Sequence, residues 1–166
     1  MTPTDALCRD LADLLAARSW MLATAESCTG GLIAAACTEL AGSSSWFERG
    51  FVTYSNAAKI ASLGVDPAAI AQHGAVSEVV ARAMAFGAVR HSDAQVGVAV
   101  TGVAGPTGGS PDKPVGTVWF GFNLHGRLSS EIRHFDGDRA AVRAQTVHHA
   151  LRRLVELVGA TPADQS

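Results

Sequence analysis

The sequence contains little charge and no concentration of charge of one sign. Charged residues make up 17% of its 166 residues, and the formal net charge is −2 with histidine neutral. No run of lysine and arginine occurs, so the chain lacks the electrostatic pattern of proteins that bind nucleic acid or a membrane surface. We therefore expect no nucleic-acid partner. A local basic pocket for a small anion remains compatible with this composition.

Long apolar runs are missing as well. No segment reaches the roughly 18 consecutive apolar residues of a membrane span. The first ten residues, MTPTDALCRD, contain acids and lack the basic and then apolar layout of a signal peptide. These absences predict a cytoplasmic protein without a membrane partner.

Cysteine is scarce, and its spacing excludes two kinds of site. The three cysteines, Cys8, Cys28 and Cys37, are odd in number and form no C-x-x-C pair, so neither a disulfide framework nor a structural zinc site is expected. The six histidines include the pair His148 and His149 but no H-E-x-x-H spacing. The sequence thus predicts reduced thiols and no bound metal.

The composition predicts one domain spanning residues 1–166, since 48% of the residues are hydrophobic and the length suffices to bury a core. Helices are expected over 4–18 (capped by Thr4 or Asp5), 31–40, 66–74, 77–92 (capped by Ser77) and 138–158. Strands are expected over 20–25, 95–103, 115–124 and 128–135, and a strand from 51 that gives way at Ser55 or Asn56 to a short helix ending near Gly64. Residues 159–166 are expected to form a frayed tail.

The order of these elements predicts an α/β fold. Helices alternate with the first strands, and the last two strands form an antiparallel hairpin. Such a sheet is mixed, and the helices cover both of its faces. We therefore expect a three-layer α/β/α architecture with a mixed sheet.

Three loops that follow expected strands are the candidate functional segments: 26–31, 54–59 and 101–114. In α/β sheets the ligand crevice lies at the carboxyl ends of strands, so the polar residues of these loops are expected to converge. The first loop is AESCTGG, and a helix is expected to begin at its end. Unpaired backbone N–H groups there favour an anion, so Thr29, Gly30 and Gly31 are candidate binding residues. An equally simple interpretation makes Ser27 or Thr29 only a helix N-cap.

Ser27 and Cys28 compete as the nucleophile of the first loop. A thiol at a helix N-terminus can have a lowered pKa, but none of the three loops contains the histidine that a nucleophilic cysteine usually needs. A serine needs another base, and Lys59 is a candidate because a helix N-terminus and partial burial lower the pKa of a lysine. Tyr54 could donate or relay a proton. Taken separately, Lys59 and Tyr54 also fit a solvated lysine and a strand-end aromatic.

The third loop is rich in glycine and proline. Its candidates for ligand binding are Thr101, Gly102, Gly105, Gly108 and Gly109. Bare glycine backbones can approach a phosphate and offer N–H donors to it, and a flexible surface loop is the alternative. The loop matches neither a dinucleotide fingerprint nor a P-loop. Arg139 and Arg143, one helical step apart, could reach the same phosphate, although this spacing is also ordinary on an exposed helix face.

Five segments together carry a more specific signal: TAESCTGG, WFERGFVTYSNAAK, QHGAVSE, TGVAGPTGGSPDKPVGTVWF and GDRAAVR. In this order they resemble the CinA C-terminal domain family of nicotinamide-nucleotide amidohydrolases, over roughly residues 20–145. The resemblance implies a CinA C-terminal-like fold and the deamidation of nicotinamide mononucleotide to nicotinate mononucleotide and ammonia. It implies no metal and no organic cofactor. Many relatives have an extra N-terminal domain, and nothing of its activity is inferred for this chain.

The resemblance places the family's nucleophilic serine on Ser27, its tyrosine on Tyr54 and its lysine on Lys59. Together with the residues themselves, it implies that Lys59 activates Ser27 for attack on the carboxamide, while backbone amides near Thr29 to Gly31 hold the oxyanion. Nicotinamide mononucleotide is then the expected partner, and self-association into a homo-oligomer is left open. The alternative function is a non-catalytic nucleotide-binding or competence-related interaction module.

Overall fold

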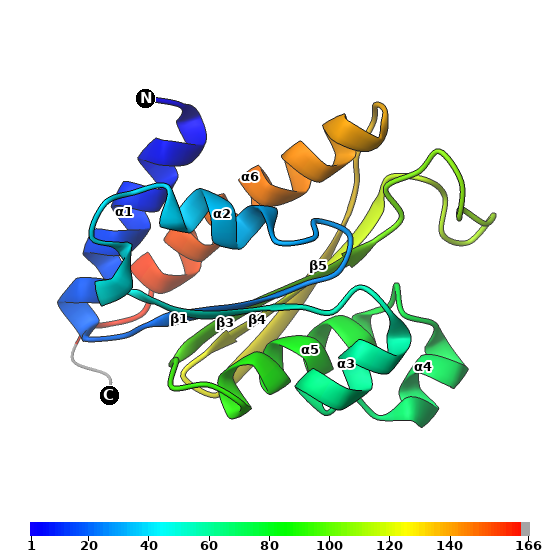
Figure 1. Ribbon diagram of the computed structural model, residues 1–166, viewed down its shortest axis with the longest axis horizontal. Coiled ribbons are helices and arrows are strands. Elements are labelled where there is room, and N and C mark those ends of the chain that lie inside the picture. The colour runs from blue at the N-terminus through cyan, green and yellow to red at the C-terminus, as the bar shows by residue number, and fades with distance from the viewer. Residues whose placement is uncertain (164–166) are drawn as a thin grey trace.

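A computed structural model describes residues 1–163 and shows a five-stranded sheet between two layers of helices (Figure 1). The strands are β1 (Leu22–Glu26), β2 (Phe47–Val52), β3 (Val96–Gly102), β4 (Thr117–Leu124) and β5 (Arg127–His134), in the spatial order β2-β1-β3-β4-β5. β1 runs parallel to β2 and β3, whereas β4 is antiparallel to β3 and β5. The predicted mixed sheet and its closing hairpin are therefore confirmed.

The helices divide between the two faces of the sheet. One face is covered by α1 (Pro3–Arg18), α2 (Leu32–Thr38) and α6 (Arg139–Gly159), and the other by α3 (Asn56–Leu63), α4 (Pro67–His73) and α5 (Glu78–Arg90) (Figure 1). A hydrophobic cluster lies on each side of the sheet, and the larger one joins α1 and α6 to β3 and β4. This arrangement confirms the three-layer α/β/α architecture.

Strand β4 shows how the sequence fits both layers at once. Phe120 and Phe122 are buried in the cluster that includes α1 and α6. The intervening Gly121 meets α5, where a Cβ atom would lie only 2.2 Å from the carbonyl oxygen of Ala81. Because successive side chains of a strand point to opposite faces, only a residue without a side chain fits between β4 and α5 at this position.

The predicted cap of α1 and the predicted start of β2 are wrong, and each error has a local cause. Helix α1 is capped by Thr2, not by Thr4 or Asp5, because Thr2 and Asp5 form a reciprocal capping box around Pro3. Strand β2 begins at Phe47 rather than at 51 and ends at Val52. It is an edge strand with exposed residues, so its first half lacks the apolar pattern of a buried strand.

The predicted caps Ser55 and Ser77 are confirmed, since their side chains accept hydrogen bonds from Ala58 N and Val80 N. The C-terminal prediction is only partly testable. Gly159, expected in the frayed tail, is the last residue of α6, and residues 164–166 lie outside the described residues. Between residues 1 and 163, no helix is both long and apolar enough to cross a membrane.

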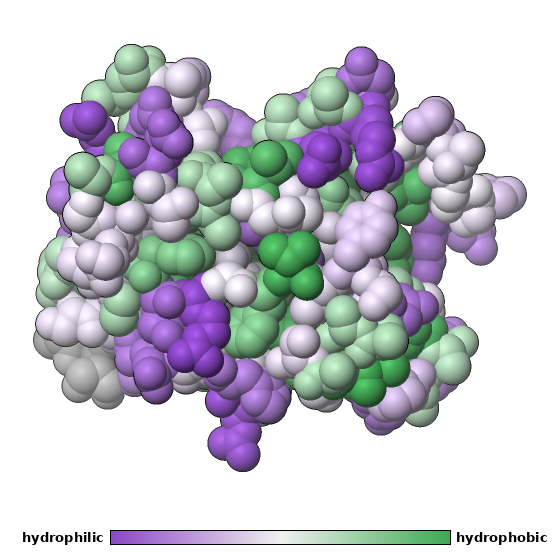
Figure 2. Space-filling view, viewed as in Figure 1, coloured by the Kyte–Doolittle hydropathy of each residue, from purple (hydrophilic) through white to green (hydrophobic). Residues whose placement is uncertain are grey.

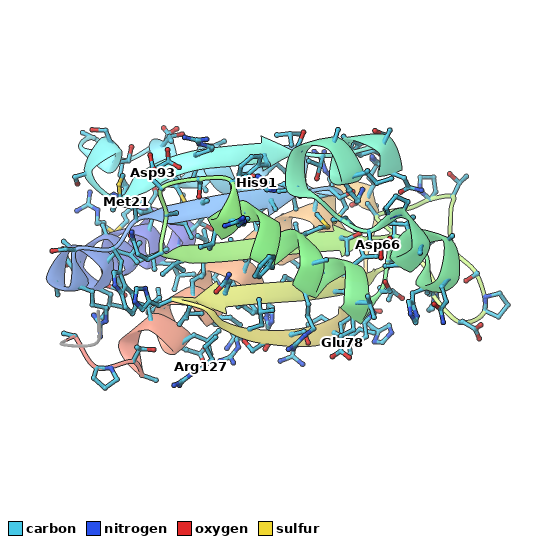
Figure 3. All side chains as sticks on the ribbon, turned by 90° about the horizontal axis from the view of Figure 1, so that it is seen from below. Met21, Asp66, Glu78, His91, Asp93 and Arg127 are labelled. Carbon is cyan, nitrogen blue, oxygen red and sulfur yellow. The ribbon has the colours of Figure 1, made fainter. Side chains whose placement is uncertain are left out.

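The two ends of the sheet differ in what surrounds them. In Figure 3, Met21 and Asp93 mark the end at which β1 and β3 begin, while Asp66 and Glu78, at the first turns of α4 and α5, lie toward the opposite end. The parallel strands β1, β2 and β3 end there, so their following loops come together at that edge.

Candidate active site

A pocket of about 210 Å³ lies where the loops after β1, β2 and β3 meet. Its lining residues are Ser27, Cys28, Tyr54, Asn56, Lys59, Ala75, Val76, Thr101, Gly102, Ala104 and Arg139. The structure thus brings all three predicted loops together.

A larger cavity of about 300 Å³ lies near the start of β5 and is lined in part by Trp20, His125 and Arg127. Within residues 1–163, no hydroxyl group of that cavity is hydrogen-bonded to a lysine or histidine side chain.

Ser27 and Lys59 form the reactive pair of the smaller pocket. The Lys59 amine lies 3.0 Å from Ser27 Oγ, although the residues are 32 positions apart. β1 delivers Ser27 at its carboxyl end, where the Ser27 N–H donates to Val100 O of the neighbouring strand β3. α3 delivers Lys59 one turn after its cap, Ser55. A hydroxyl and an amine at this distance have the geometry of a nucleophile and its base.

Burial shifts the protonation equilibrium of the Lys59 amine toward its neutral form. Only 1% of the Lys59 surface is exposed, and this burial lowers its pKa below that of an ordinary lysine. No carboxylate of residues 1–163 forms an ion pair with it. Its other partners are the backbone carbonyls of Thr53, at 2.9 Å, and Tyr54, at 3.1 Å. Nζ is the donor to all three oxygens. When the amine loses a proton, it keeps two N–H donors for the carbonyls and gains one lone pair that can accept the proton of Ser27.

Cys28 lies next to Ser27 but in a state unsuited to attack. It is 6% exposed, and burial raises the pKa of its thiol to about 11. At pH 7 a thiol with this pKa is thiolate in about one molecule in 10⁴. The geometry and the charge state therefore both favour Ser27 over Cys28, an alternative that the sequence left open.

Residues 27–31, between β1 and α2, form the turn that carries Ser27 (the Ser27 turn). Glu26, which was not among the residues predicted from the sequence, holds this turn in place. Its buried carboxylate accepts hydrogen bonds from the Thr29 hydroxyl, from Ile33 N at 2.9 Å and from Ala34 N at 3.0 Å. The first N–H groups of α2 are thus occupied by Glu26 and are not open to a ligand. The sequence did contain a signal, since Glu26 is the one charged residue at the end of the apolar run WMLATAE.

Tyr54 and Arg139 form one wall of the pocket. Tyr54 is 63% exposed, and its hydroxyl lies 3.3 Å from Nη2 of Arg139 at the start of α6. Nη1 of Arg139 donates to Gly105 O at 2.9 Å. In the described part of the chain, no hydrogen bond joins the Tyr54 hydroxyl to Ser27 or Lys59. The tyrosine side chain is therefore placed at the mouth of the pocket, beside a cation.

Arg143 lies outside the pocket lining. Its Nε donates to Cys28 O at 3.0 Å, and its Nη2 donates to Thr29 O at 3.2 Å. Gly30 lies against the same guanidinium, because a Cβ at Gly30 would be 3.4 Å from Nη2. The two arginines of α6 thus differ in environment. Arg139 lines the pocket, whereas Arg143 is hydrogen-bonded to the backbone of the Ser27 turn outside it.

Of the other predicted binding residues, some line the pocket and some do not. Thr101 and Gly102 line the pocket, and the Thr101 hydroxyl donates to Ala75 O. The residues outside the lining are Thr29, Gly30, Gly31, Gly105, Gly108 and Gly109. Asn56, which sequence reasoning treated only as a cap, does line the pocket and offers an amide side chain to it.

A second cavity of about 450 Å³ adjoins the first. The two share Ala104 and Arg139, and the second is also lined by Pro106, Val115 and the first residues around the α6 N-terminus. Figure 2 shows hydrophilic side chains gathered over the orange N-terminal part of α6 in Figure 1. The two cavities therefore lie next to each other, with Arg139 in the lining of both.

Comparisons with known proteins show which sequences and structures the chain resembles. The model of the CinA C-terminal domain matches residues 4–158. The chain is 54% identical to the nicotinamide-nucleotide amidohydrolase PncC of Pseudomonas putida, over 95% of this chain and 98% of that protein. It is 51% identical to PncC of Escherichia coli K12, over 89% and 90% of the two chains. The crystal structure of the competence/damage inducible protein CihA from Agrobacterium tumefaciens has a TM-score of 0.90 at 45% identity, covering 95% of this chain and 96% of that one.

Proposed function

The chain belongs to the CinA C-terminal domain family, and we propose that it hydrolyses the carboxamide of nicotinamide mononucleotide to give nicotinate mononucleotide and ammonia. The names of the relatives at 51–55% identity support the substrate. One observation carries the chemistry: a buried Lys59 amine, which no carboxylate of residues 1–163 pairs with, lies 3.0 Å from Ser27 Oγ. That pair is what amide hydrolysis through an acyl-enzyme requires.

In the first half of the proposed reaction, Ser27 is acylated. Lys59 takes the proton of the Ser27 hydroxyl as the serine oxygen bonds to the carboxamide carbon, whose carbonyl oxygen becomes an oxyanion. The backbone N–H groups of Cys28 and Thr29 are the proposed oxyanion donors, because neither has a hydrogen-bond acceptor among residues 1–163. The N–H of Gly30 is already donated to Ser27 O.

In the second half, the acyl-enzyme is hydrolysed. The intermediate collapses, the carbon–nitrogen bond breaks, and Lys59 returns its proton to the leaving nitrogen as ammonia forms. Lys59 then takes a proton from a water molecule that attacks the ester, and it finally returns the proton to Ser27. The cycle uses Ser27, Lys59 and water, and Lys59 is neutral at its start and at its end.

The rest of the substrate is proposed to extend into the adjoining cavity. We propose that the nicotinamide ring lies in the cavity with Ser27 and that the ribose phosphate lies toward Arg139, which lines both cavities. Arg139 suits this role because it has no carboxylate partner in the described part of the chain, so its charge is available to a phosphate. Tyr54, bonded to Arg139, is proposed to contact the substrate rather than to relay protons.

The experiment is to incubate the purified protein with nicotinamide mononucleotide and to measure ammonia and nicotinate mononucleotide. We expect both products in equal amounts from the wild type and at least a 10³-fold lower rate from Ser27→Ala. The Ser27→Ala variant should still bind the nucleotide. Binding by the wild type without ammonia release would instead support a non-catalytic nucleotide-binding module.

A further inference from the structure

We infer that Arg143 is a positioning residue for the nucleophile, which acts through the Ser27 turn and not through the phosphate of the substrate. This inference deepens the proposed function and rests on it. It is carried by two hydrogen bonds that join α6 to the backbone of the turn, from Nε to Cys28 O and from Nη2 to Thr29 O.

The geometry of these bonds uses the planar shape of arginine. Nε and Nη2 lie on the same edge of the guanidinium, so one rigid group holds two successive carbonyls at 3.0 and 3.2 Å. A lysine ammonium is a compact point charge that cannot reproduce this planar fork. Arg143 is partly buried between α6 and the turn, and its neighbour Val142 is fully buried in the core. The guanidinium is therefore anchored to a rigid helix.

The turn needs such an anchor because it has no regular structure of its own. β1 ends at Glu26 and α2 begins at Leu32, and Gly30 and Gly31 have positive φ angles of 57° and 105°. Glu26 holds the turn from the core side through Thr29 and the first N–H groups of α2. Arg143 binds the same turn from α6. Glu26 and Arg143 together therefore fix the backbone that carries Ser27.

The orientation of the peptide groups connects Arg143 to the chemistry. In a trans peptide the N–H points opposite to the preceding C=O. Because Arg143 attracts the Cys28 carbonyl, the N–H of Thr29 points away from the guanidinium and stays unpaired in the described residues. Loss of the fork frees this peptide to rotate, and it loosens Ser27 relative to Lys59. Misplacement of a reacting group by about 1 Å can lower a rate roughly 10²-fold.

A phosphate role for Arg143 fits the structure less well. Arg143 lines neither the pocket with Ser27 nor the adjoining cavity, whereas Arg139, one turn earlier on α6, lines both. Arg139 is therefore the natural reference for Arg143, because it is the same residue type on the same helix. Arg139 faces the cavities, and Arg143 faces the Ser27 turn.

The test compares Arg143→Lys and Arg143→Met with Arg152→Lys as a matched control. Arg152 lies on the same helix and contacts Glu156 and His149, and none of these three residues lines the two cavities, so its variant should keep wild-type activity. We expect both Arg143 variants to lower kcat for nicotinamide mononucleotide by about 10- to 100-fold. KM should change less than about 3-fold, and Tm should show that the variants remain folded. Because Lys keeps the charge but not the fork, it should be impaired nearly as much as Met.

A phosphate-free reaction separates the two roles. Labelling of Ser27 by a serine-reactive sulfonyl fluoride, followed by mass spectrometry, needs no nucleotide and has Ser27→Ala as its blank. We expect Arg143→Lys to be labelled about 10-fold more slowly than the wild type. Wild-type labelling in this variant, or a raised KM with unchanged kcat, would overturn the inference. If the wild type is labelled at Ser27 yet releases no ammonia from nicotinamide mononucleotide, the proposed substrate fails and the labelling rates still decide the role of Arg143.

Discussion

Replacing Lys59 by Met removes the proposed base while retaining a side chain of similar length in a site that is 1% exposed. Loss of a general base typically lowers a rate by about 10²–10⁴-fold, which corresponds to roughly 2.7–5.4 kcal/mol of activation free energy. The pocket offers no substitute next to Ser27. Arg139 cannot accept a proton, the Cys28 thiol has a pKa of about 11, and the Tyr54 hydroxyl is hydrogen-bonded to Arg139. We therefore expect a loss near the upper end of this range.

Lys59→Arg separates charge from basicity. Arginine keeps a cation near Ser27 but cannot act as a base at any accessible pH, so it should be as inactive as methionine. If the lysine acted only by its positive charge, arginine would retain substantial activity. Ammonia release measures the rate, and titration with nicotinamide mononucleotide shows whether each variant still has a folded substrate site. An active Lys59→Arg or Lys59→Met would remove the lysine from the base role.

The pH dependence gives the same prediction a second readout. Since burial lowers the pKa of Lys59, the acidic limb of kcat/KM should have its midpoint below about 10.4, the pKa of an ordinary lysine. Between the lowered folded pKa and the ordinary unfolded pKa, the unfolded chain binds more protons than the folded chain. The free energy of unfolding of the wild type should therefore rise relative to Lys59→Met as pH increases through that window. If the difference in the free energy of unfolding between the wild type and Lys59→Met did not change with pH, folding would not lower the pKa of Lys59.

Three further substitutions test neighbouring residues. Cys28→Ala should retain most amidase activity, because the thiol is protonated at neutral pH; a dead variant would reverse the choice of nucleophile. Glu26→Gln should leave one of the N–H groups of Ile33 and Ala34 without its acceptor and lower the free energy of unfolding by about 1–3 kcal/mol, measured by urea titration; an unchanged midpoint would contradict this. Arg139→Ala should raise KM for nicotinamide mononucleotide but not for nicotinamide riboside, which lacks the phosphate; equal effects would argue against phosphate binding.

Much of the fold could be predicted from local pattern. Apolar spacing and caps located α5 and α6, and the paired runs after residue 115 located the β4–β5 hairpin. The prediction was weakest at β2, where the edge position leaves charged and exposed residues such as Glu48 and Arg49 in a strand. A strand that is held mainly by backbone pairing to one neighbour carries little signal in its side chains.

The candidate site was predictable in part for a similar reason. Loops that follow parallel strands meet at one edge of a sheet. The predicted strand ends were therefore enough to select the candidates Ser27, Tyr54, Lys59 and Thr101. Their contacts were not predictable. Whether two arginines one turn apart face the same ligand depends on how α6 lies across the Ser27 turn, and the sequence assigned the same role to Arg139 and Arg143.

The sequence by itself therefore determined the order of the elements and the residue types at each strand end, because these follow from interactions between near neighbours along the chain. Only the tertiary structure decided the direction of the pKa shifts and the pairing of those residues. The lowered pKa of Lys59 and the raised pKa of Cys28 arise from burial against segments distant in the sequence, since Lys59 packs against Ser27 and Cys28 lies in the cluster that includes α1 and α6. Desolvation and hydrogen bonding act through space, so residue spacing along the chain does not specify them.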